Sequence, residues 1–226
     1  MLLLVTDTSG KQGFVGLVRV DEGSEEAVQL VESTPLGGGT FSAQLVPQVA
    51  GLLAKHGFEK SSIDAFIVVS GPGSFTGLRV GLAAIKALAE ILGKPILAVS
   101  LLEAIAVGSG REGKILSAID AGRGEVYAGE YEIDGRSSRA VSERLLTREE
   151  FRGKARGANV ATSSQAWAQA AQEAGAAVSL NQPPDAATIA RLGLQKLQAG
   201  GTITPEQLEA NYIRRSDAEI FSKPGA

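Results

Sequence analysis

The stretch Ser70–Gly81, which reads SGPGSFTGLRVG, has the residue types of a turn that could bind an anion. Gly71 and Gly73 permit backbone angles with positive φ, and Ser74 or Thr76 can cap the helix that follows. Such a turn directs free backbone N–H groups outward from a helix N-terminus, where a phosphate or the carboxylate of a partner could bind. The alternative is a tight turn that only lets the helix pack closely on a sheet.

Two known phosphate-binding loops do not match this stretch. A Walker A loop ends in Gly-Lys-Ser/Thr, and no lysine occurs between Lys60 and Lys86. The dinucleotide fingerprint is G-x-G-x-x-G, whereas Gly71, Gly73 and Gly77 are spaced G-x-G-x-x-x-G. Close packing is therefore the simpler explanation of these glycines.

The helix predicted after the turn carries a stripe of small residues. Gly77, Gly81 and Ala84 fall at i, i+4 and i+7, and a glycine in a helix interior costs about 1 kcal/mol relative to alanine. Two such glycines indicate that something packs there, either this chain's own sheet or another protein. Arg79, in the first turns of the same helix, is either a solvated charge or a donor to a partner's carboxylate.

Composition excludes several kinds of chemistry. The chain has no cysteine and one histidine, so thiol nucleophiles and Cys/His zinc sites are excluded, and a Ser-His-Asp triad would have to use His56. His56 precedes Gly57 at the end of a predicted helix, which favours a structural role at the helix C-terminus. The net charge of −3 argues against binding nucleic acid without a basic partner.

The length of 226 residues suits one large domain or two small lobes. The segment Met1–Val5 reaches polar residues too early for a signal peptide, and no stretch approaches the ~20 apolar residues of a membrane-spanning helix. We therefore expect a cytoplasmic protein without membrane association.

Apolar periodicity predicts strands and helices in a mixed order. In the first half, we expect strands at 2–5, 13–20, 27–32, 65–69 and 96–99, and helices at 42–56 and 78–92. In the second half, we expect a strand pair starting at 114, strands near 140–145, 159–161 and 177–180, and helices at 165–173 and up to Gln198, the last one capped by Asp185.

The two halves resemble each other. At an offset of 113 residues, Asp120 falls on Asp7, Tyr127 on Phe14 and Gly129 on Gly16, and the element order repeats. This predicts two lobes made from one duplicated unit, which we divide into 1–100 and 101–226. A tail over about 205–226 is expected to pack back on the first lobe. Trp167 is interpreted as a core residue rather than a ligand-stacking one.

Four motifs, in chain order, resemble the TsaB family, formerly YeaZ, of tRNA threonylcarbamoyladenosine biosynthesis proteins. They are Asp7-Thr8-Ser9, the stretch Ser70–Gly81, the segment Asp120–Tyr127 and Tyr212-Ile213-Arg214, and they span nearly the whole chain. The resemblance implies an α/β fold of the actin-like and sugar-kinase-like ATPases, with two ribonuclease-H-like lobes.

The resemblance also implies a function. Family members are generally regarded as non-catalytic and pair with the paralogue TsaD and the ATPase TsaE, which transfer a threonylcarbamoyl group to the adenosine beside the anticodon of tRNA. We expect TsaD and TsaE homologues as partners, a homodimer when the chain is alone, and tRNA contact only through the complex. ATP or ADP with Mg²⁺ is expected at the level of the complex, and no cofactor, metal or catalytic residue in this chain alone.

Pairing is expected through the first lobe, on the helix after the Gly-rich turn and the helix at 42–56. The expected partner-contact residues are Leu45, Val49, Gly77, Arg79, Val80, Gly81 and Ala84. Phe41 stands where members of the family usually carry a histidine, which removes a metal ligand at that place. Peptidase activity is therefore not expected.

The competing hypothesis is a small-molecule kinase or ATPase of the same fold. The resemblance places Asp7 and Asp120 where such ATPases orient phosphate and metal, although either carboxylate could instead accept N–H bonds from its own turn. The candidate phosphate-contacting residues are Asp7, Thr8, Ser9, Gly71, Gly73, Asp120 and Gly122. The short second lobe, without an evident Gly-Gly-Gly adenosine loop, argues against this alternative.

Overall fold

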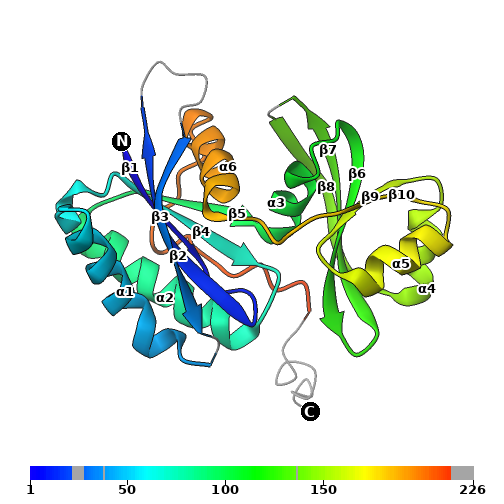
Figure 1. Cartoon of the computed structure of the whole chain (residues 1–226), viewed down its shortest axis with the longest axis horizontal. Coiled ribbons are helices and arrows are strands. Elements are labelled where there is room, and N and C mark those ends of the chain that lie inside the picture. The colour runs from blue at the N-terminus through cyan, green and yellow to red at the C-terminus, as the bar shows by residue number, and fades with distance from the viewer. Residues whose placement is uncertain (22–27, 38, 136, 215–226) are drawn as a thin grey trace, which may run out of the picture.

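Five strands from the first half of the chain form one mixed sheet (Figure 1). They are β1 (Leu2–Asp7), β2 (Gln12–Val20), β3 (Val28–Gly37), β4 (Ala65–Gly71) and β5 (Ile96–Ser100), in the order β3-β2-β1-β4-β5. β1 reads LLLVTD and is buried on both faces, as a central strand covered by helices on both sides must be. The computed structural model describes residues 1–21, 28–37, 39–135 and 137–214.

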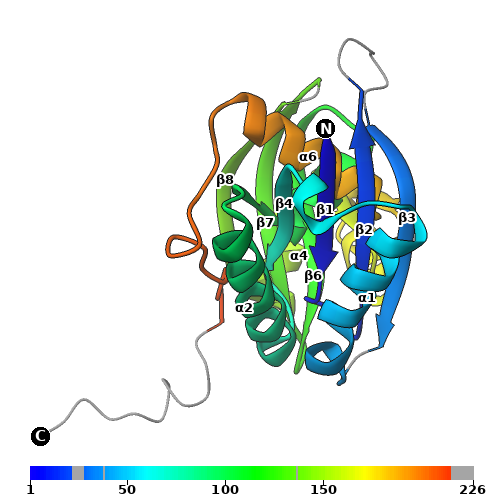
Figure 2. The same ribbon diagram turned by 90° about the vertical axis from the view of Figure 1, so that its left-hand side faces the viewer.

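The outer face of the first sheet is covered by α1 (Phe41–Lys55) and α2 (Phe75–Leu92), which lie in front of it in Figure 2. Apolar residues at helical spacing on both helices, including Leu45, Val49, Leu82 and Ile85, pack with Leu2 and Leu4 of β1. α2 is capped at its N-terminus by Ser74, whose side chain accepts from the Gly77 N–H, and at its C-terminus by Gly93, which has a φ of +61°.

The second half forms a sheet with the same strand order. Its strands are β6 (Gly113–Gly122), β7 (Glu125–Asp134), β8 (Ser137–Thr147), β9 (Asn159–Thr162) and β10 (Ala177–Leu180), in the order β10-β9-β6-β7-β8. The outer face is covered by α4 (Arg148–Ala155) and α5 (Gln165–Glu173), where Trp167 is buried in the core as predicted. Two sheets with one strand order confirm the duplicated fold.

Each inner face, toward the other lobe, is covered by one helix (Figure 1). α3 (Leu101–Gly108) packs on the second sheet, with Leu102 and Ile105 among its core residues. α6 (Ala186–Gln198) packs on the first sheet, with Ile189 and Leu192 in that core, although its position in the chain assigned it to the second lobe. The helix that follows the first sheet in the chain, α3, thus packs on the second sheet, and the helix that follows the second sheet, α6, packs on the first.

The segment after α6 follows the first lobe. Ile203 forms an antiparallel bridge with Ile96 of β5, and Leu208 is buried in the core beneath α1 and α2. The Asn211 N–H then donates to the carbonyl of Ser70, at the end of β4, at 2.8 Å. The predicted tail continues beyond 214 into residues outside the described part of the chain.

Several elements differ from the sequence prediction. α3 and α4 were not predicted, and β3 runs to Gly37 rather than ending at Glu32. α1 matches the predicted helix at 42–56 and contains Pro47, which is exposed in its second turn. Among the residues that the structure describes, none of the helices has the length and apolar character required to cross a bilayer.

Candidate functional site

The Gly-rich turn joins β4 to α2 and packs on the turn between β1 and β2. The Ser74 N–H donates to the Ser9 carbonyl at 2.7 Å, and a Cβ at Gly73 would lie 2.3 Å from the same oxygen. Real Cβ atoms do not approach an oxygen so closely, so only glycine fits at this position. Gly71 has a φ of +121°, which other residues rarely adopt. These observations support the packing interpretation of the turn.

The small-residue stripe also packs inside the chain. A Cβ at Gly77 would lie 2.1 Å from the Thr8 carbonyl oxygen, and a Cβ at Gly81 would lie 2.1 Å from Thr8 Oγ1. The ring of Phe41, buried at the start of α1, comes within 3.1 Å of the same Gly77 position. Of the two neighbours that the sequence allowed, the structure shows the chain's own β1–β2 turn.

Four residues predicted to contact a partner are therefore enclosed in the first lobe. They are Leu45, Val49, Gly77 and Gly81, all of them buried. The prediction is corrected for these four, because groups inside the core cannot touch another protein while the lobe stays folded.

Three predicted partner-contact residues stay accessible. Val80 and Ala84 are half-buried, and Arg79 is exposed. The guanidinium of Arg79 lies 3.8 Å from the centroid of the Phe75 ring, and its Nε donates to the Tyr212 hydroxyl at 3.2 Å. Within the chain, Arg79 is thus engaged by aromatic rings rather than by a carboxylate. Contact of these three residues with a partner stays a prediction.

Asp7 is held by its own turn. Only 9% of the residue is exposed, and Oδ1 accepts both the Ser9 N–H at 2.8 Å and the Ser9 hydroxyl at 2.6 Å. Burial raises the pKa of this carboxyl, against the opposing effect of the two Ser9 hydrogen bonds. Asp7 therefore has the structural role that the sequence left as an alternative to phosphate binding.

Asp120 is exposed and lies against α5. Its Oδ1 accepts the Trp167 indole N–H at 3.2 Å and the Gly122 N–H at 3.1 Å. Because side chains alternate along a strand, Asp120 shares the outer face of β6 with Leu116 and Ala118, which pack under α4 and α5. Asp7 instead shares the inner face of β1 with residues covered by α6.

The opposite directions of the two aspartates come from a one-residue difference in register. Asp7 pairs with Phe14 across β1 and β2, whereas Tyr127, the counterpart of Phe14, pairs with Ile119 across β6 and β7. Ile119, not Asp120, therefore occupies the Asp7 position. The predicted superposition of the aspartates is wrong, because one residue of slip turns a side chain to the other face of a sheet.

The matched glycines show that Phe14 and Tyr127 are true counterparts. A Cβ at Gly16 would lie 2.7 Å from Cβ of Ala186 in α6, and a Cβ at Gly129 would lie 3.1 Å from Cβ of Leu102 in α3. Both glycines thus lie under the inner helix of their lobe. The offset of 113 residues therefore relates β2 to β7 correctly, but it does not relate β1 to β6.

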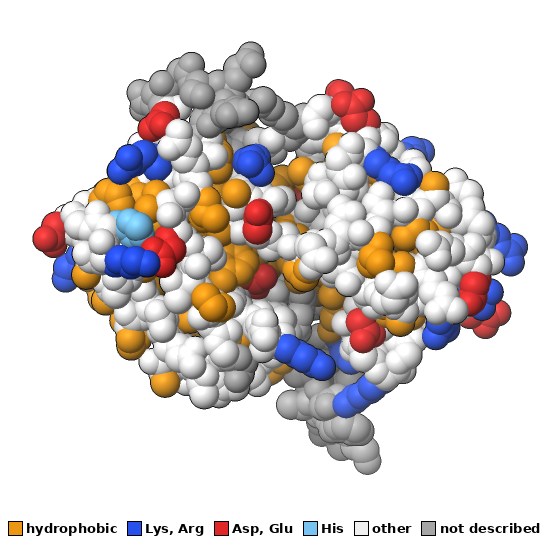
Figure 3. Space-filling view, in the orientation of Figure 1, with side chains coloured by type: hydrophobic (Ala, Val, Ile, Leu, Met, Phe, Trp, Pro, Cys, Tyr) orange, Lys and Arg blue, Asp and Glu red, His pale blue; other side chains and the backbone are white. Residues whose placement is uncertain are grey.

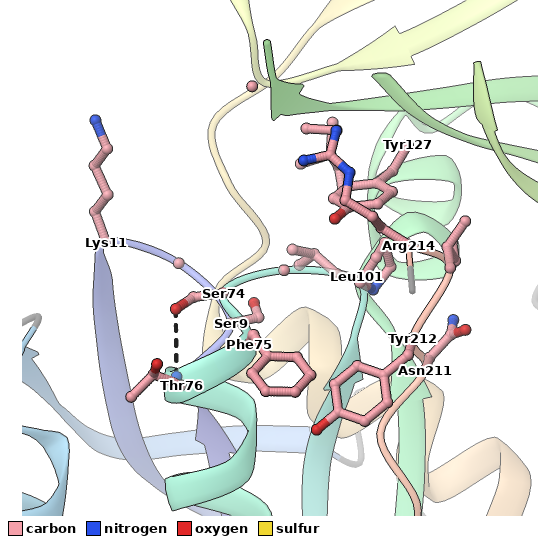
Figure 4. Close-up of a pocket in the computed structure, with 18 of the residues that line it drawn as sticks. Ser9, Lys11, Ser74, Phe75, Thr76, Leu101, Tyr127, Asn211, Tyr212 and Arg214 are labelled. Atoms are coloured by element: carbon pink, nitrogen blue, oxygen red, sulfur yellow. Dashed lines mark hydrogen bonds between the residues drawn. The ribbon is translucent and has the colours of Figure 1, made fainter. Parts of the chain in front are cut away.

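A cleft of about 1260 Å³ separates the lobes. Its walls are Ser9–Lys11, Pro72–Gly77, Asp120–Arg123 and Asn211–Arg214, each from a turn or from the tail (Figure 4). Thr8 and Asp7 lie behind this surface, and Ser9, Gly73, Asp120 and Gly122 lie on it. Lys and Arg side chains flank the lower end of the groove between the lobes in Figure 3.

Three cationic side chains line the cleft, and one of them, Arg214, is ion-paired with Glu125. The three are Lys11, Arg123 and Arg214, with Asp120 as an acidic neighbour. The ring of Tyr127 lies 5.9 Å below the Arg214 guanidinium, and Figure 4 shows these two side chains together on one side. Sequence reasoning missed Lys11, because a single lysine in a turn carries no signal of its own.

The single histidine of the sequence, His56, is not among the residues that line the cleft. His56 ends α1, where it lies 2.7 Å from Glu32 of β3, and this confirms its structural role. The hydrogen bonds from Lys55 and His56 lower the pKa of Glu32. In the part of the chain that the structure describes, no three His, Asp or Glu side chains are grouped so that they could hold a metal ion.

The fold defines the class. Two ribonuclease-H-like sheets of one strand order, with turns facing each other across a cleft, form the actin-like ATPase fold. A Pseudomonas aeruginosa structure described as similar to peptidase YEAZ superposes with a TM-score of 0.74 at 28% identity, over 94% of this chain and 99% of that one. The structure of YeaZ from Pseudomonas aeruginosa gives a TM-score of 0.73 at 26% identity, over 93% and 99%.

Sequence comparisons identify the family. Residues 38–194 match the family model "TsaD: tRNA N6-adenosine threonylcarbamoyltransferase". The Escherichia coli tRNA threonylcarbamoyladenosine biosynthesis protein TsaB is 30% identical over 77% of this chain and 81% of its own length. The Bacillus subtilis TsaB is 35% identical over 58% of this chain and 56% of its own length. The chain belongs to the TsaB (YeaZ) family.

Proposed function

We propose that this chain is a cytoplasmic, non-catalytic partner subunit in threonylcarbamoyladenosine biosynthesis on tRNA. In this role it pairs with a homologue of TsaD, and with TsaE, and it raises the activity of the transferase without contributing a reacting group. The family membership and the relatives named for this biosynthesis support the process. The geometry of the two aspartates supports the non-catalytic role.

The observation that carries the proposal is the divergence of Asp7 and Asp120. An ATPase of this fold needs carboxylates from both lobes directed at one Mg²⁺ and its phosphates. Here Asp7 is buried and engaged by Ser9, and Asp120 accepts the Trp167 indole N–H on the outer side of the second sheet. Asp120 still lines the cleft, whereas Asp7 lies behind its wall, so the cleft presents one of the two carboxylates and not both.

The exposed sides of α1 and α2 are the proposed docking surface. Val46 of α1 is 48% exposed and Ile91 of α2 is 76% exposed, and both are large apolar side chains. Ala83 is exposed in the middle of α2, so a partner helix could approach the backbone there. A second copy of the chain would cover the same surface in a homodimer, which would compete with the heteromeric pair.

Nucleotide binding is proposed for the complex rather than for this chain. Of the two predicted carboxylates only Asp120 lines the cleft, so the chain alone does not present the pair that would hold Mg²⁺ with ATP or ADP. We expect the isolated chain to show no saturable Mg-ATP binding in a calorimetric titration. ATP hydrolysis should require the partner proteins.

Reconstitution tests the proposal. The chain is mixed with TsaD and TsaE homologues of the same organism, ATP, Mg²⁺, the threonylcarbamoyl donor and unmodified tRNA, and modified adenosine is counted by mass spectrometry. We expect no modification with the chain alone, and at least a tenfold loss when it is omitted. Ala83→Glu should lower the yield, because it buries a charge in the docking surface, whereas Val141→Glu on the exposed edge of the second lobe should not. Full modification without the chain would refute the proposal.

A further inference from the structure

The tail crosses from the first lobe to the second. On the first lobe, Leu208 is 1% exposed and the Asn211 N–H donates to the Ser70 carbonyl. On the second lobe, the Asn211 side-chain amide donates to Glu143 Oε2, and Arg214 forms an ion pair with Glu125. Residues 208–214 are thus tied to both lobes within a few residues.

Glu143, on β8, is the centre of these ties. Its Oε1 accepts the Ser100 hydroxyl at 2.5 Å and the Tyr131 hydroxyl, while Oε2 accepts from Asn211. Ser100 ends β5 of the first sheet, and Tyr131 belongs to β7 of the second. One carboxylate therefore joins the first sheet, the second sheet and the tail through hydrogen bonds to a charged acceptor, which are the stronger kind.

Two details show that this arrangement is specific. Ser100 is the N-cap residue of α3, yet its side chain makes no capping bond and donates to Glu143 instead. Burial, with Glu143 nearby, raises the pKa of Tyr131, so the phenol stays protonated and remains a donor. The missing side-chain capping bond at the N-terminus of α3 lowers stability, and the hydrogen bond from Ser100 to Glu143 offsets this loss.

We infer that Glu143, Ser100, Tyr131 and Asn211 form an interlobe latch, which fixes the angle between the lobes and the width of the cleft. The tail side of the cleft is walled by Asn211–Arg214, so the cleft opens there only when Asn211 leaves Glu143. The inner helices also meet, through the ion pair of Lys196 with Glu103 at 3.0 Å and through Ala104 of α3, which is buried in one apolar cluster with Ile189 of α6. Lobes of one chain are expected to move relative to one another unless their interface is large and hydrophobic, so the bonds of Glu143 are what adds a fixed direction to this packing.

An exchange of the amide and the carboxylate tests the latch. In Asn211→Asp two carboxylates face each other, so this change breaks the bond. Glu143→Gln alone still offers a side-chain oxygen to the Asn211 amide, so it only replaces a charge-assisted bond with a weaker neutral one. The double variant restores it in the reverse direction, because the new glutamine amide donates to the new aspartate. The side-chain oxygen of the glutamine at position 143 can still accept from Ser100 and Tyr131. Recovery by the double variant separates a lost contact from a loss of folding.

The absence of native cysteine allows two unique spin labels. Ala54→Cys on α1 and Gln172→Cys on α5 are exposed positions on the outer helices of the two lobes. Double electron–electron resonance then gives the interlobe distance distribution, and hydrogen exchange gives the protection of the Asn211 amide. Glu132→Gln on β7 is the matched control, since it removes the same charge from a surface ion pair with Arg139.

Asn211→Asp should broaden the distance distribution toward longer values and speed exchange of the residue 211 amide about tenfold or more, and Glu143→Gln should have a smaller effect. The double variant and Glu132→Gln should both give the original distribution and exchange rate. The latch is refuted if Asn211→Asp leaves the distribution unchanged, or if the double variant is as broad as Asn211→Asp.

Discussion

Gly81 lies against Thr8 so closely that a single methyl group should destabilise the first lobe. A Cβ at Gly81 would lie 2.1 Å from Thr8 Oγ1 and 3.0 Å from its Cγ2, and Thr8 is only 2% exposed, so it has no free space to move into. Overpacking costs typically about 1–3 kcal/mol, and we take the upper end because the contact is so short. Replacing a helical glycine with alanine returns about 1 kcal/mol. The net cost of Gly81→Ala is then roughly 2 kcal/mol, or a Tm lower by roughly 4–8 °C.

Two further variants make the test specific. Gly51→Ala changes a helical glycine of α1 that has no atom within 4 Å of the added Cβ, so it should raise the Tm slightly. Thr8→Ala removes the clashing oxygen and methyl group, so the pair Gly81→Ala and Thr8→Ala should recover most of the loss in a double-mutant cycle. Thermal unfolding followed by circular dichroism measures the original protein and these four variants. An unchanged Tm for Gly81→Ala, or no coupling with Thr8→Ala, would show that the stripe does not pack on this turn.

Three other outcomes are expected. Asp7→Asn keeps both Ser9 hydrogen bonds, because both are accepted by Oδ1. Since the pKa of Asp7 is raised in the folded protein, the original protein gains stability as the pH falls through that pKa toward the ordinary value of 3.8. The Tm of the variant minus that of the original protein should therefore be more positive at pH 7 than at pH 4. A Tm difference that is the same at both pH values would contradict the raised pKa of the buried Asp7 carboxyl. Asp185→Ala loses the cap that accepts the Thr188 N–H at 2.8 Å, and the Tm should fall by roughly 2–4 °C, whereas the exposed Asp134→Ala should change it little. The chain alone should bind tRNA weakly in a filter assay at physiological salt because its net charge is −3, and a submicromolar Kd would contradict this.

Helices and strands with a clear apolar periodicity and with capping or turn residues at their ends were predictable from the sequence. The helix at 165–173 and the strand at 177–180 match α5 and β10, and Asp185 caps α6 as its sequence indicates. α3 reads LLEAIAVG and is buried almost all round between the lobes, so it shows no amphipathic period in the sequence. α4 had a readable signal, the capping box of Thr147 and Glu150, which the periodicity alone did not reveal.

The candidate site was predictable in its motifs and less so in its geometry. The turns that carry Ser9, Gly73 and Asp120 do face one cleft. The direction of Asp120 depends on a hairpin register that differs by one residue between lobes, and no local pattern around Asp120 reports it. Whether a small-residue stripe meets its own chain or a partner is likewise decided by tertiary packing, so Gly77 and Gly81 could not be assigned from spacing alone.

The exchanged inner helices have a consequence for synthesis on the ribosome. The inner face of the first sheet, with Leu3, Val5 and Ile67, is covered by α6, which is among the last parts of the chain to be made. When residue 100 leaves the exit tunnel, this sheet has its strands and outer helices but presents an apolar face to water. The first lobe therefore cannot close its core before the second lobe has been translated, and until then its exposed face is a binding site for chaperones.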